Sequence, residues 1–254
     1  MNETGFAIWD GIYETFAQSS GDENVFESTI WIKKISERAK ESLRAMRAES
    51  AVPAVAVNRS YILPVIGALV QARRGKLSVL DFGGGLGASY LPTIAGMPAE
   101  ANVEFHVVEG EAVVKEGRKL FEDYPQLHFY SELPSLDEPI DIVHAGSALH
   151  YVEEWKSMLG ALVHYAPRYL IFADLPAGNI KTFVTIQNFH GRKIPVWFWD
   201  IAEFTSAVEG LGFRYIYRCR CVETGVKAGQ QLPMSNFPER YRLDYTCQLL
   251  FERD

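Results

Sequence analysis

Apolar residues recur at helical spacing in the first part of the chain and in strand-like runs after it. Between Val25 and Ala48, apolar side chains return every three or four residues with charges between them, which is typical of an amphipathic helix. Pro53 breaks this pattern, because proline cannot donate the next backbone hydrogen bond of a helix. Residues 1–76 are therefore predicted to be a helical extension.

A further helix is predicted within this extension. Asn58 or Ser60 is placed to cap its start, the apolar pattern runs to about Arg74, and Gly75 is placed to end it. The extension could supply extra core, a contact between two copies of the chain, or a cap over a binding site. A cap is favoured, because chemistry in a cleft benefits from the exclusion of water.

From residue 77 strands alternate with helices, which favours a parallel α/β sheet over residues 77–254. Strands are predicted at 77–82, 103–109, 127–131, 140–145 and 168–174, with helices at 86–95, 111–123 and 152–165. A long polar and aromatic loop is expected at 175–197, followed by a helix near 199–210. The last two strands, 213–221 and 243–251, are expected at the edge of the sheet.

The most informative stretch is the glycine cluster after the first predicted strand. That strand ends with Asp81 and Phe82, and Gly83, Gly84 and Gly85 follow at once. Glycine lets a ligand approach the backbone closely and lets the chain turn with positive φ. If a helix starts at Leu86, its first N–H groups face the ligand. This pattern predicts a nucleotide-like ligand at the carboxyl end of a parallel strand.

Two ligands fit this turn. Gly83, Gly85 and Ala88 satisfy the spacing of the dinucleotide fingerprint, but Asp81 would lie close to a pyrophosphate and repel it. S-adenosylmethionine (SAM) carries a positive ammonium and sulfonium, and its one carboxylate can be bound by the N–H groups of the loop. The charge of Asp81 therefore favours SAM. A dinucleotide, or a turn that holds no ligand, stays open.

Glu109 is placed to bind a ribose. It follows the alternating residues 103–108, which read as the second strand, and Gly110 comes next. A carboxylate at this place can accept hydrogen bonds from two neighbouring hydroxyls. The alternative is that Glu109 and Glu111 are acids at the start of a helix, where negative charge is favoured.

Three segments resemble the class I SAM-dependent methyltransferases, namely residues 81–87 (DFGGGLG), 108–110 (VEG) and 141–151 (DIVHAGSALHY). The resemblance implies a Rossmann-like fold whose seven-stranded sheet is mostly parallel, with one antiparallel strand at its edge. It also implies SAM as the cofactor. The predicted cofactor-binding residues are Asp81, Gly83, Gly84, Gly85, Glu109, Gly110, Ser131, Gly146 and Ser147.

The chain also resembles a bacterial group of methyltransferases associated with surface-polysaccharide gene clusters. Residues 185–188 and 248–251 add to this likeness, which covers about residues 77–252. It implies methyl transfer to an oxygen of a sugar or a sugar-derived acceptor. An N- or carboxyl-methyltransferase of another small metabolite, a non-catalytic binding protein of the same fold and an NAD-dependent reductase stay open.

In the strand order of this family, residues 132–139 must cross about three strand spacings of ~4.8 Å while they return ~16 Å along the strands. The path is about 22 Å, and eight extended residues span at most about 27 Å. Pro134 and Pro139 also disfavour a helix here. We therefore predict a nearly extended crossover with at most a single helical turn.

His150 is the first candidate for the catalytic base, because it follows the fourth predicted strand and imidazole suits proton removal near neutral pH. A loop histidine that only packs on the cofactor is the alternative. Asp174, at the end of the fifth strand, and His190 are further catalytic candidates. Gln187, Asn188 and Arg192 are predicted to bind the substrate, since amides suit sugar hydroxyls and a guanidinium suits an anion.

Composition agrees with a cytoplasmic enzyme that acts on small molecules. The 254 residues are 48% hydrophobic and carry a net charge of −7, with no basic stripe, which makes nucleic acid an unfavourable substrate. The N-terminal residues lack the pattern of a secretory signal, and the apolar run 61–70 is about half the ~20 residues that span a bilayer. Three cysteines give no disulfide framework, and no pair of histidines has the spacing of metal ligands.

Overall fold

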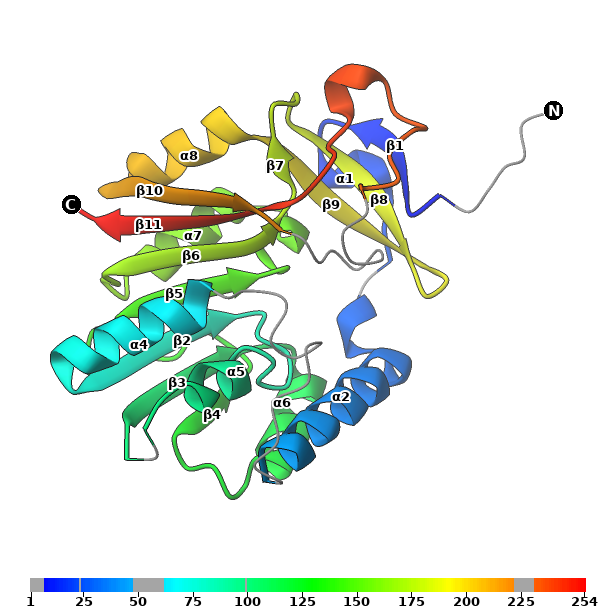
Figure 1. Cartoon of the computed structure of the whole chain (residues 1–254). Coiled ribbons are helices and arrows are strands. Elements are labelled where there is room, and N and C mark those ends of the chain that lie inside the picture. Colours follow the sequence, from blue (N-terminus) through cyan, green and yellow to red (C-terminus); the bar gives the residue numbers. More distant parts are fainter. Residues whose placement is uncertain (1–6, 23, 48–61, 99, 222–230) are drawn as a thin grey trace.

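A seven-stranded sheet forms the centre of the computed structural model, with helices on both of its faces (Figure 1). The structure describes all residues except 1–6, 23, 48–61, 99 and 222–230. The strand order is β10-β11-β6-β5-β2-β3-β4. In chain order these strands are β2 (Lys76–Phe82), β3 (Asn102–Val108), β4 (Leu127–Tyr130), β5 (Ile142–Gly146), β6 (Tyr169–Leu175), β10 (Phe213–Arg220) and β11 (Cys247–Arg253).

The predicted parallel α/β sheet is confirmed, with one refinement at its edge. Strands β4, β3, β2, β5 and β6 pair in parallel, whereas β11 pairs antiparallel with both β6 and β10. The single antiparallel strand therefore lies one place in from the edge, and β10 is the edge strand. The last strand starts at Cys247 rather than at the expected residue 243.

Successive side chains of β2 point to opposite faces of the sheet, so β2 contributes to the hydrophobic core on both faces. Val79 packs with α4 (Ile62–Arg74), α5 (Tyr90–Ala95) and α6 (Glu111–Leu120), and Leu80 packs on the other face with α7 (Trp155–Val163) and α8 (Ile201–Glu209). Each fully buried side chain of this size contributes about 1.5–3 kcal/mol to folding. The apolar run of β2 is thus explained by burial on both faces.

Helix α4 ends where the sequence predicts. Its last residue is Arg74, and Gly75 follows with φ +73° while its N–H donates to the carbonyl of Gln71 at 2.8 Å. Glycine reaches this left-handed conformation without a steric penalty. The expected cap at Asn58 or Ser60 and the break at Pro53 lie outside the described residues.

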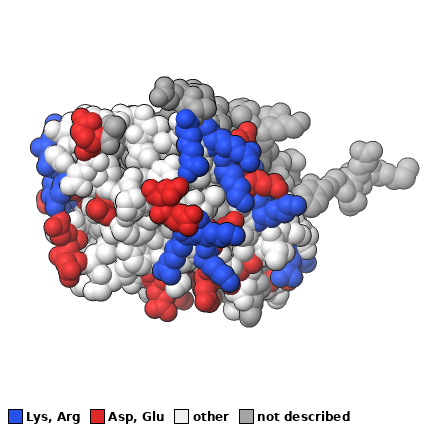
Figure 2. All heavy atoms as spheres, turned by 90° about the horizontal axis from the view of Figure 1, so that it is seen from below, with Lys and Arg blue, Asp and Glu red and all other residues white. Residues whose placement is uncertain are grey.

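Helix α2 (Thr29–Arg47) confirms the amphipathic helix predicted from the N-terminal pattern, and the short turn η1 (Val25–Glu27) precedes it. It is joined to α6, where Glu116 accepts from the Ser36 hydroxyl at 2.8 Å and pairs with Lys40 at 3.8 Å. Seen from below, Lys and Arg side chains gather over α2 and α6 with acidic side chains between them (Figure 2). The exposed side of this face therefore carries charges of both signs.

A second, four-stranded sheet is formed by segments that were expected to be helical (within residues 1–76) or a loop (residues 175–197). Its order is β1-β8-β9-β7, with β1 (Trp9–Tyr13), β7 (Ala177–Gly178), β8 (Phe183–Phe189) and β9 (Arg192–Asp200). The helical prediction for residues 1–76 is thus wrong over β1, which is followed by the short helix α1 (Phe16–Ser19). Strand β1 pairs with β8, and a local pattern cannot reveal a partner so distant in sequence.

The loop predicted at 175–197 is wrong as well, because most of it is a β-hairpin. Strands β8 and β9 pair from Phe183 and Phe198 to Phe189 and Arg192. The two residues between them, His190 and Gly191, have φ +50° and +79°. Two central residues with positive φ are typical of the tight turn that matches the twist of paired strands.

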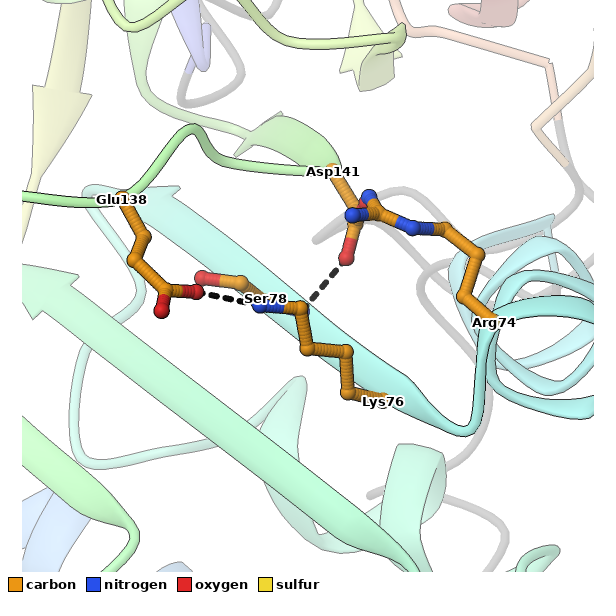
Figure 3. Close-up of polar contacts among 5 residues, drawn as sticks. All are labelled: Arg74, Lys76, Ser78, Glu138 and Asp141. Carbon is orange, nitrogen blue, oxygen red and sulfur yellow. Dashed lines mark hydrogen bonds and ion pairs between the residues drawn. The ribbon is translucent and has the colours of Figure 1, made fainter.

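The crossover at residues 132–139 contains no helix, which confirms the prediction from its length. Figure 3 shows how its end is held: Lys76 pairs with Glu138, and Arg74 pairs with Asp141. The second carboxylate oxygen of Asp141 accepts from the Ser78 N–H at 2.9 Å. Asp141 therefore fastens the start of β5 to β2, at the end of the sheet opposite the glycine loop.

The missing crossover helix explains a polar surface on β3 and β4. Glu104, His106, His128 and Tyr130 alternate with Phe105 and the other apolar residues that face α6. His106 and His128 stack with ring centroids 5.1 Å apart, and His128 contacts Glu104 at 2.7 Å. Burial and the neighbouring His128 lower the pKa of His106 to about 4.

Candidate ligand site at the rim of the sheet

The glycine loop leaves β2 in a backbone form that few other residues adopt. Gly83 and Gly85 have φ +69° and +58°. A Cβ on Gly83 would lie 2.4 Å from the Cβ of Ala148, whereas a Cβ on Gly85 would have no neighbour within 4 Å in the described structure. The absence of a side chain at Gly83 thus makes room for Ala148, whereas at Gly85 it leaves open space beside the loop.

Helix α5 (Tyr90–Ala95) confirms the end of the helix predicted at 86–95, but its predicted start at Leu86 is wrong. Residues 86–89 form turns instead, in which the N–H groups of Tyr90 and Leu91 both donate to the Gly87 carbonyl. The helix is only six residues long. Any ligand on the glycines therefore meets the loop backbone itself and not the start of a regular helix.

Glu109 follows β3 directly and is fixed by the backbone on both sides. One carboxylate oxygen accepts from the Gly85 N–H and the other from the Gly110 N–H, each at 3.0 Å. Burial raises the pKa of the Glu109 carboxyl, the two backbone hydrogen bonds oppose this rise, and the nearby carboxylates of Asp81 and Glu27 add to it. A carboxylate oxygen has more than one lone pair, so each oxygen can still accept from a ligand hydroxyl.

A cavity of about 900 Å³ opens above these groups at the carboxyl ends of the strands. Its wall is built from the sheet rim, from α2 and from the hairpin of the second sheet. The cavity brings together most of the predicted site residues, which are Gly83, Gly84, Gly85, Glu109, Gly110, Ser131, Gly146, Ser147, His150, Asp174, Gln187, Asn188 and His190.

Asp81 and Arg192 do not line this cavity, which corrects their predicted direct contacts. Arg192 is exposed on the outer end of β9. Asp81 is fully buried under the glycine loop, and its Oδ1 lies 2.6 Å from Nδ1 of His144 on β5. His144 itself lines the cavity, so this imidazole lies between the Asp81 carboxylate and the cavity.

His150 lies in the short turn η2 (Leu149–Tyr151) just after β5. Its ring packs against Tyr151 with centroids 4.2 Å apart, and its Nδ1 is buried without a hydrogen-bond partner in the described part of the chain. Burial lowers the pKa of His150 to about 3. The imidazole is therefore neutral near pH 7, and His150 is one of the residues of the cavity wall.

Asp174 is already engaged at the rim. Its two carboxylate oxygens accept from the hydroxyls of Ser147 and of Thr246, the latter at 2.6 Å. Ser147 and Asp174 have φ +52° and +50°, which is unfavourable for residues with a side chain. Strained backbone of this kind is concentrated at functional sites. Asp174 thus holds the rim in shape, and Thr246 is a lining residue that the sequence did not single out.

The predicted substrate residues of the hairpin make contacts within the protein. Gln187 Oε1 accepts from the Tyr151 hydroxyl at 2.8 Å, and the Asn188 amide donates to the Ala7 carbonyl at 2.8 Å. His190 Nε2 lies 3.3 Å from the Lys34 ammonium of α2. These bonds tie the hairpin to the turn after β5, to the N-terminal segment and to α2.

Four aromatic rings, which we call the aromatic bridge, join the extension to the rest of the cavity wall. Phe26 lies with its ring centroid 4.7 Å from that of Tyr151 and 5.9 Å from that of Phe189. Trp31 on α2 lies 5.3 Å from Phe189. All four residues line the cavity. Only the long aromatic stretch before residue 197 hinted at such a cluster in the sequence.

Neither a metal site nor a membrane span is found in the described part of the chain. No group of three or more His, Cys, Asp or Glu side chains there is arranged to hold a metal ion. No helix there is both long enough and apolar enough to cross a bilayer.

Solved structures share this fold, although the chain matches no family model and no curated protein sequence. One is the 1,6-didemethyltoxoflavin-N1-methyltransferase of Burkholderia thailandensis, with 14% identity, a TM-score of 0.52, and coverage of 96% of this chain and 99% of that one. Another is from the complex of the Haloferax volcanii Trm112 methyltransferase activator with a methyltransferase (12% identity, TM-score 0.51, 88% and 94% covered). The chain therefore has the Rossmann-like methyltransferase fold, which confirms the predicted fold class.

Proposed function

We propose that this protein is a SAM-dependent methyltransferase that acts on a hydroxyl of a small polar acceptor, with sugars as the favoured class. Glu109 carries the proposal, because it presents a fixed carboxylate to the cavity directly beside the open face of Gly85. A ribose needs such a pair of acceptor oxygens, and a cofactor needs the space that a side chain at residue 85 would fill. The residues present thus fit SAM.

The order of the strands sets the direction in which the cofactor lies. With the ribose on Glu109 after β3, the base extends toward Ser131 after β4, and the amino acid end extends toward Gly146 and Ser147 after β5. Ligands of open α/β sheets lie across the carboxyl ends of the strands in this way. The acceptor then occupies the part of the cavity walled by α2 and by the hairpin.

When bound, SAM supplies a methyl group on a sulfonium, which is a good leaving group. The protein must then hold the acceptor oxygen in line with that methyl group, keep water out and take one proton. His150 is the proposed proton acceptor, because the residue lines the cavity, its Nδ1 has no partner among the described residues and the imidazole is neutral. The aromatic bridge and α2 exclude water, so the segment from η1 through α2 acts as a cap over the cavity, whereas α4 packs into the core of the sheet.

A hydroxyl acceptor is favoured by the groups around the cavity. Neutral imidazole can accept a proton from a hydroxyl, and aromatic rings such as those of Trp31 and Phe189 can pack against the apolar face of a sugar. The preference for a sugar over another small hydroxyl compound rests on the family resemblance in the sequence.

Calorimetry with SAM, its demethylated product S-adenosylhomocysteine and NAD tests the cofactor. We expect micromolar or tighter binding of the first two and none of NAD, and binding of NAD alone would overturn the proposal. Incubation with SAM and pools of sugars, amines and carboxylic acids, followed by mass spectrometry, then identifies the acceptor class. Binding of SAM without methylation of any pool would favour a non-catalytic binding protein.

A further inference from the structure

A buried aspartate–histidine pair lies directly beneath the candidate cofactor site. Asp81 on β2 and His144 on β5 face each other across adjacent parallel strands, and their side chains are 0% and 2% exposed. Asp81 Oδ1 and His144 Nδ1 lie 2.6 Å apart. A carboxylate only accepts hydrogen bonds, so Nδ1 of His144 carries the hydrogen and the imidazole is held in one orientation.

The opposite nitrogen of this imidazole has no partner. His144 Nε2 is buried and makes no hydrogen bond with any described residue, yet His144 is part of the cavity wall. A buried polar atom left without a partner costs about 1–3 kcal/mol. Because His144 belongs to the cavity wall, the missing hydrogen bond is explained if a ligand in the cavity supplies it.

Two glycines shape the backbone around the pair. A Cβ on Gly84 would lie 2.4 Å from Oδ2 of Asp81, and a Cβ on Gly146 would lie 2.8 Å from Cε1 of His144. Any side chain at either residue would therefore displace the pair. The glycines thus serve to place the carboxylate and the imidazole close under the ligand, in addition to letting the chain turn.

We propose that His144, oriented by Asp81, binds the amino group at the amino acid end of the cofactor. The inference rests on the proposed function, because that function places the ribose at Glu109 after β3. From there the amino acid end must extend over β2 and toward β5, which are the two strands that carry the pair. With the hydrogen on Nδ1, Nε2 of the imidazole accepts a hydrogen bond from the ammonium, and the buried carboxylate of Asp81 complements its positive charge.

His144 is a positioning residue in this account and takes no proton from the acceptor. Its side chain projects from β5 two residues before the strand ends, below Gly146, whereas His150 lies beyond the end of the same strand. The cofactor therefore lies between His144 and the acceptor. Loss of Nε2 should weaken cofactor binding rather than proton transfer.

Calorimetry with three ligands separates this contact from a general effect on the loop. The ligands are S-adenosylhomocysteine, its analogue that lacks only the amino group, and 5′-methylthioadenosine, which lacks the whole amino acid end. The wild type should bind S-adenosylhomocysteine at least tenfold more tightly than the deaminated analogue, because a hydrogen bond to a charged group is lost. His144→Asn should abolish this difference and leave the affinity for 5′-methylthioadenosine within about twofold.

The choice of substitutions keeps the test independent of folding. In His144→Asn the amide nitrogen replaces Nδ1 and keeps the bond to Asp81, whereas in His144→Gln an amide oxygen can replace Nε2 and should restore part of the difference. Thermal unfolding of both variants confirms that they are folded. An equal loss of affinity for all three ligands in both variants would overturn the inference and leave the proposed function standing. A wild type that binds none of the three ligands would overturn both.

Discussion

Phe26 and Tyr151 meet edge to face with ring centroids 4.7 Å apart, although 125 residues separate them in the sequence. Phe26 belongs to the turn before α2, and Tyr151 belongs to the turn after β5. An aromatic pair of this geometry contributes about 0.5–1.5 kcal/mol beyond the area that it buries. The segment before α2 is therefore fastened to the rim of the main sheet by ring contacts at the cavity itself.

Removal of the Phe26 ring should loosen the cap over the acceptor. We expect Phe26→Ala to raise the KM of the acceptor several-fold and to lower turnover, with the affinity for S-adenosylhomocysteine almost unchanged. Steady-state kinetics and calorimetry measure these effects. Phe16→Ala is the matched control, because Phe16 packs on Trp197 outside the cavity lining. Equal kinetic effects in the two variants would contradict the role of the aromatic bridge.

Glu109→Ala should weaken binding of S-adenosylhomocysteine at least tenfold, since the ribose loses its charged acceptor. Glu111→Ala is the control, because Glu111 lies two residues away and does not line the cavity. Burial raises the pKa of Glu109, so the acceptor carboxylate is lost as the pH falls through this raised value. Affinity in the wild type should therefore decline on acidification, and Glu109→Gln should lack this part of the decline.

Gly85→Ala should weaken cofactor binding more than it weakens the fold. Gly85 and Gly75 have φ +58° and +73°, and a Cβ on either meets no described atom within 4 Å. Each substitution should therefore cost about 1–2 kcal/mol of stability through backbone strain alone. Only residue 85 lines the cavity, so only Gly85→Ala should reduce the affinity for S-adenosylhomocysteine. A similar loss of affinity in Gly75→Ala would argue against a cofactor on the loop.

His150→Ala should lower turnover at least tenfold and leave the affinity for S-adenosylhomocysteine intact. Because burial lowers the pKa of His150 to about 3, protonation of this residue should not reduce the rate between pH 5 and 8. Single-turnover rates across that range provide the measurement. Unchanged turnover in the variant would remove His150 from the role of proton acceptor.

His150 should also make the fold sensitive to acid. Its pKa is about 3 in the folded protein and about 6.5 in the unfolded chain, so the unfolded chain binds the extra proton between these values. The contribution of neutral His150 to the free energy of unfolding is fully present above pH 6.5. It falls by up to about 1.4 kcal/mol per pH unit as the pH decreases toward 3. Urea unfolding between pH 4 and 7 measures how the free energy of unfolding changes with pH. This change should be smaller for His150→Asn than for His164→Asn, a control at an exposed residue.

The local parts of this fold are predictable from the sequence because their signals are local. The glycine cluster and Glu109 each follow an apolar strand directly, so their place at the rim follows from the chain itself. The missing crossover helix is also predictable, since the length of eight residues and two prolines limit the path. The hairpin also has a local feature, because His190 and Gly191 form a turn pair with positive φ between two strands.

The contacts between distant segments could not be predicted in this way. Asp81 lies between Leu80 and Phe82, and His144 lies between Val143 and Ala145, so each is a polar residue with apolar neighbours in a strand. Such residues are marked as buried and in need of a partner. Only the strand order shows that they are partners of one another. The aromatic bridge is similar, because its rings come from three segments whose proximity depends on the complete topology.

The pairing of β1 and of β11 with strands distant in sequence has a consequence for folding during synthesis. Strand β1 pairs with β8, with Asp10 opposite Ile186, and β6 pairs with β11, with Cys247 opposite Leu175. In both pairs the second strand is made long after the first. Contacts between such remote positions slow folding, since a long loop must close before they form. During translation, the N-terminal strand therefore leaves the ribosome long before any partner exists for its backbone. Thr246 follows every other described lining residue in chain order, so a nascent chain cannot form the complete pocket before this residue is made.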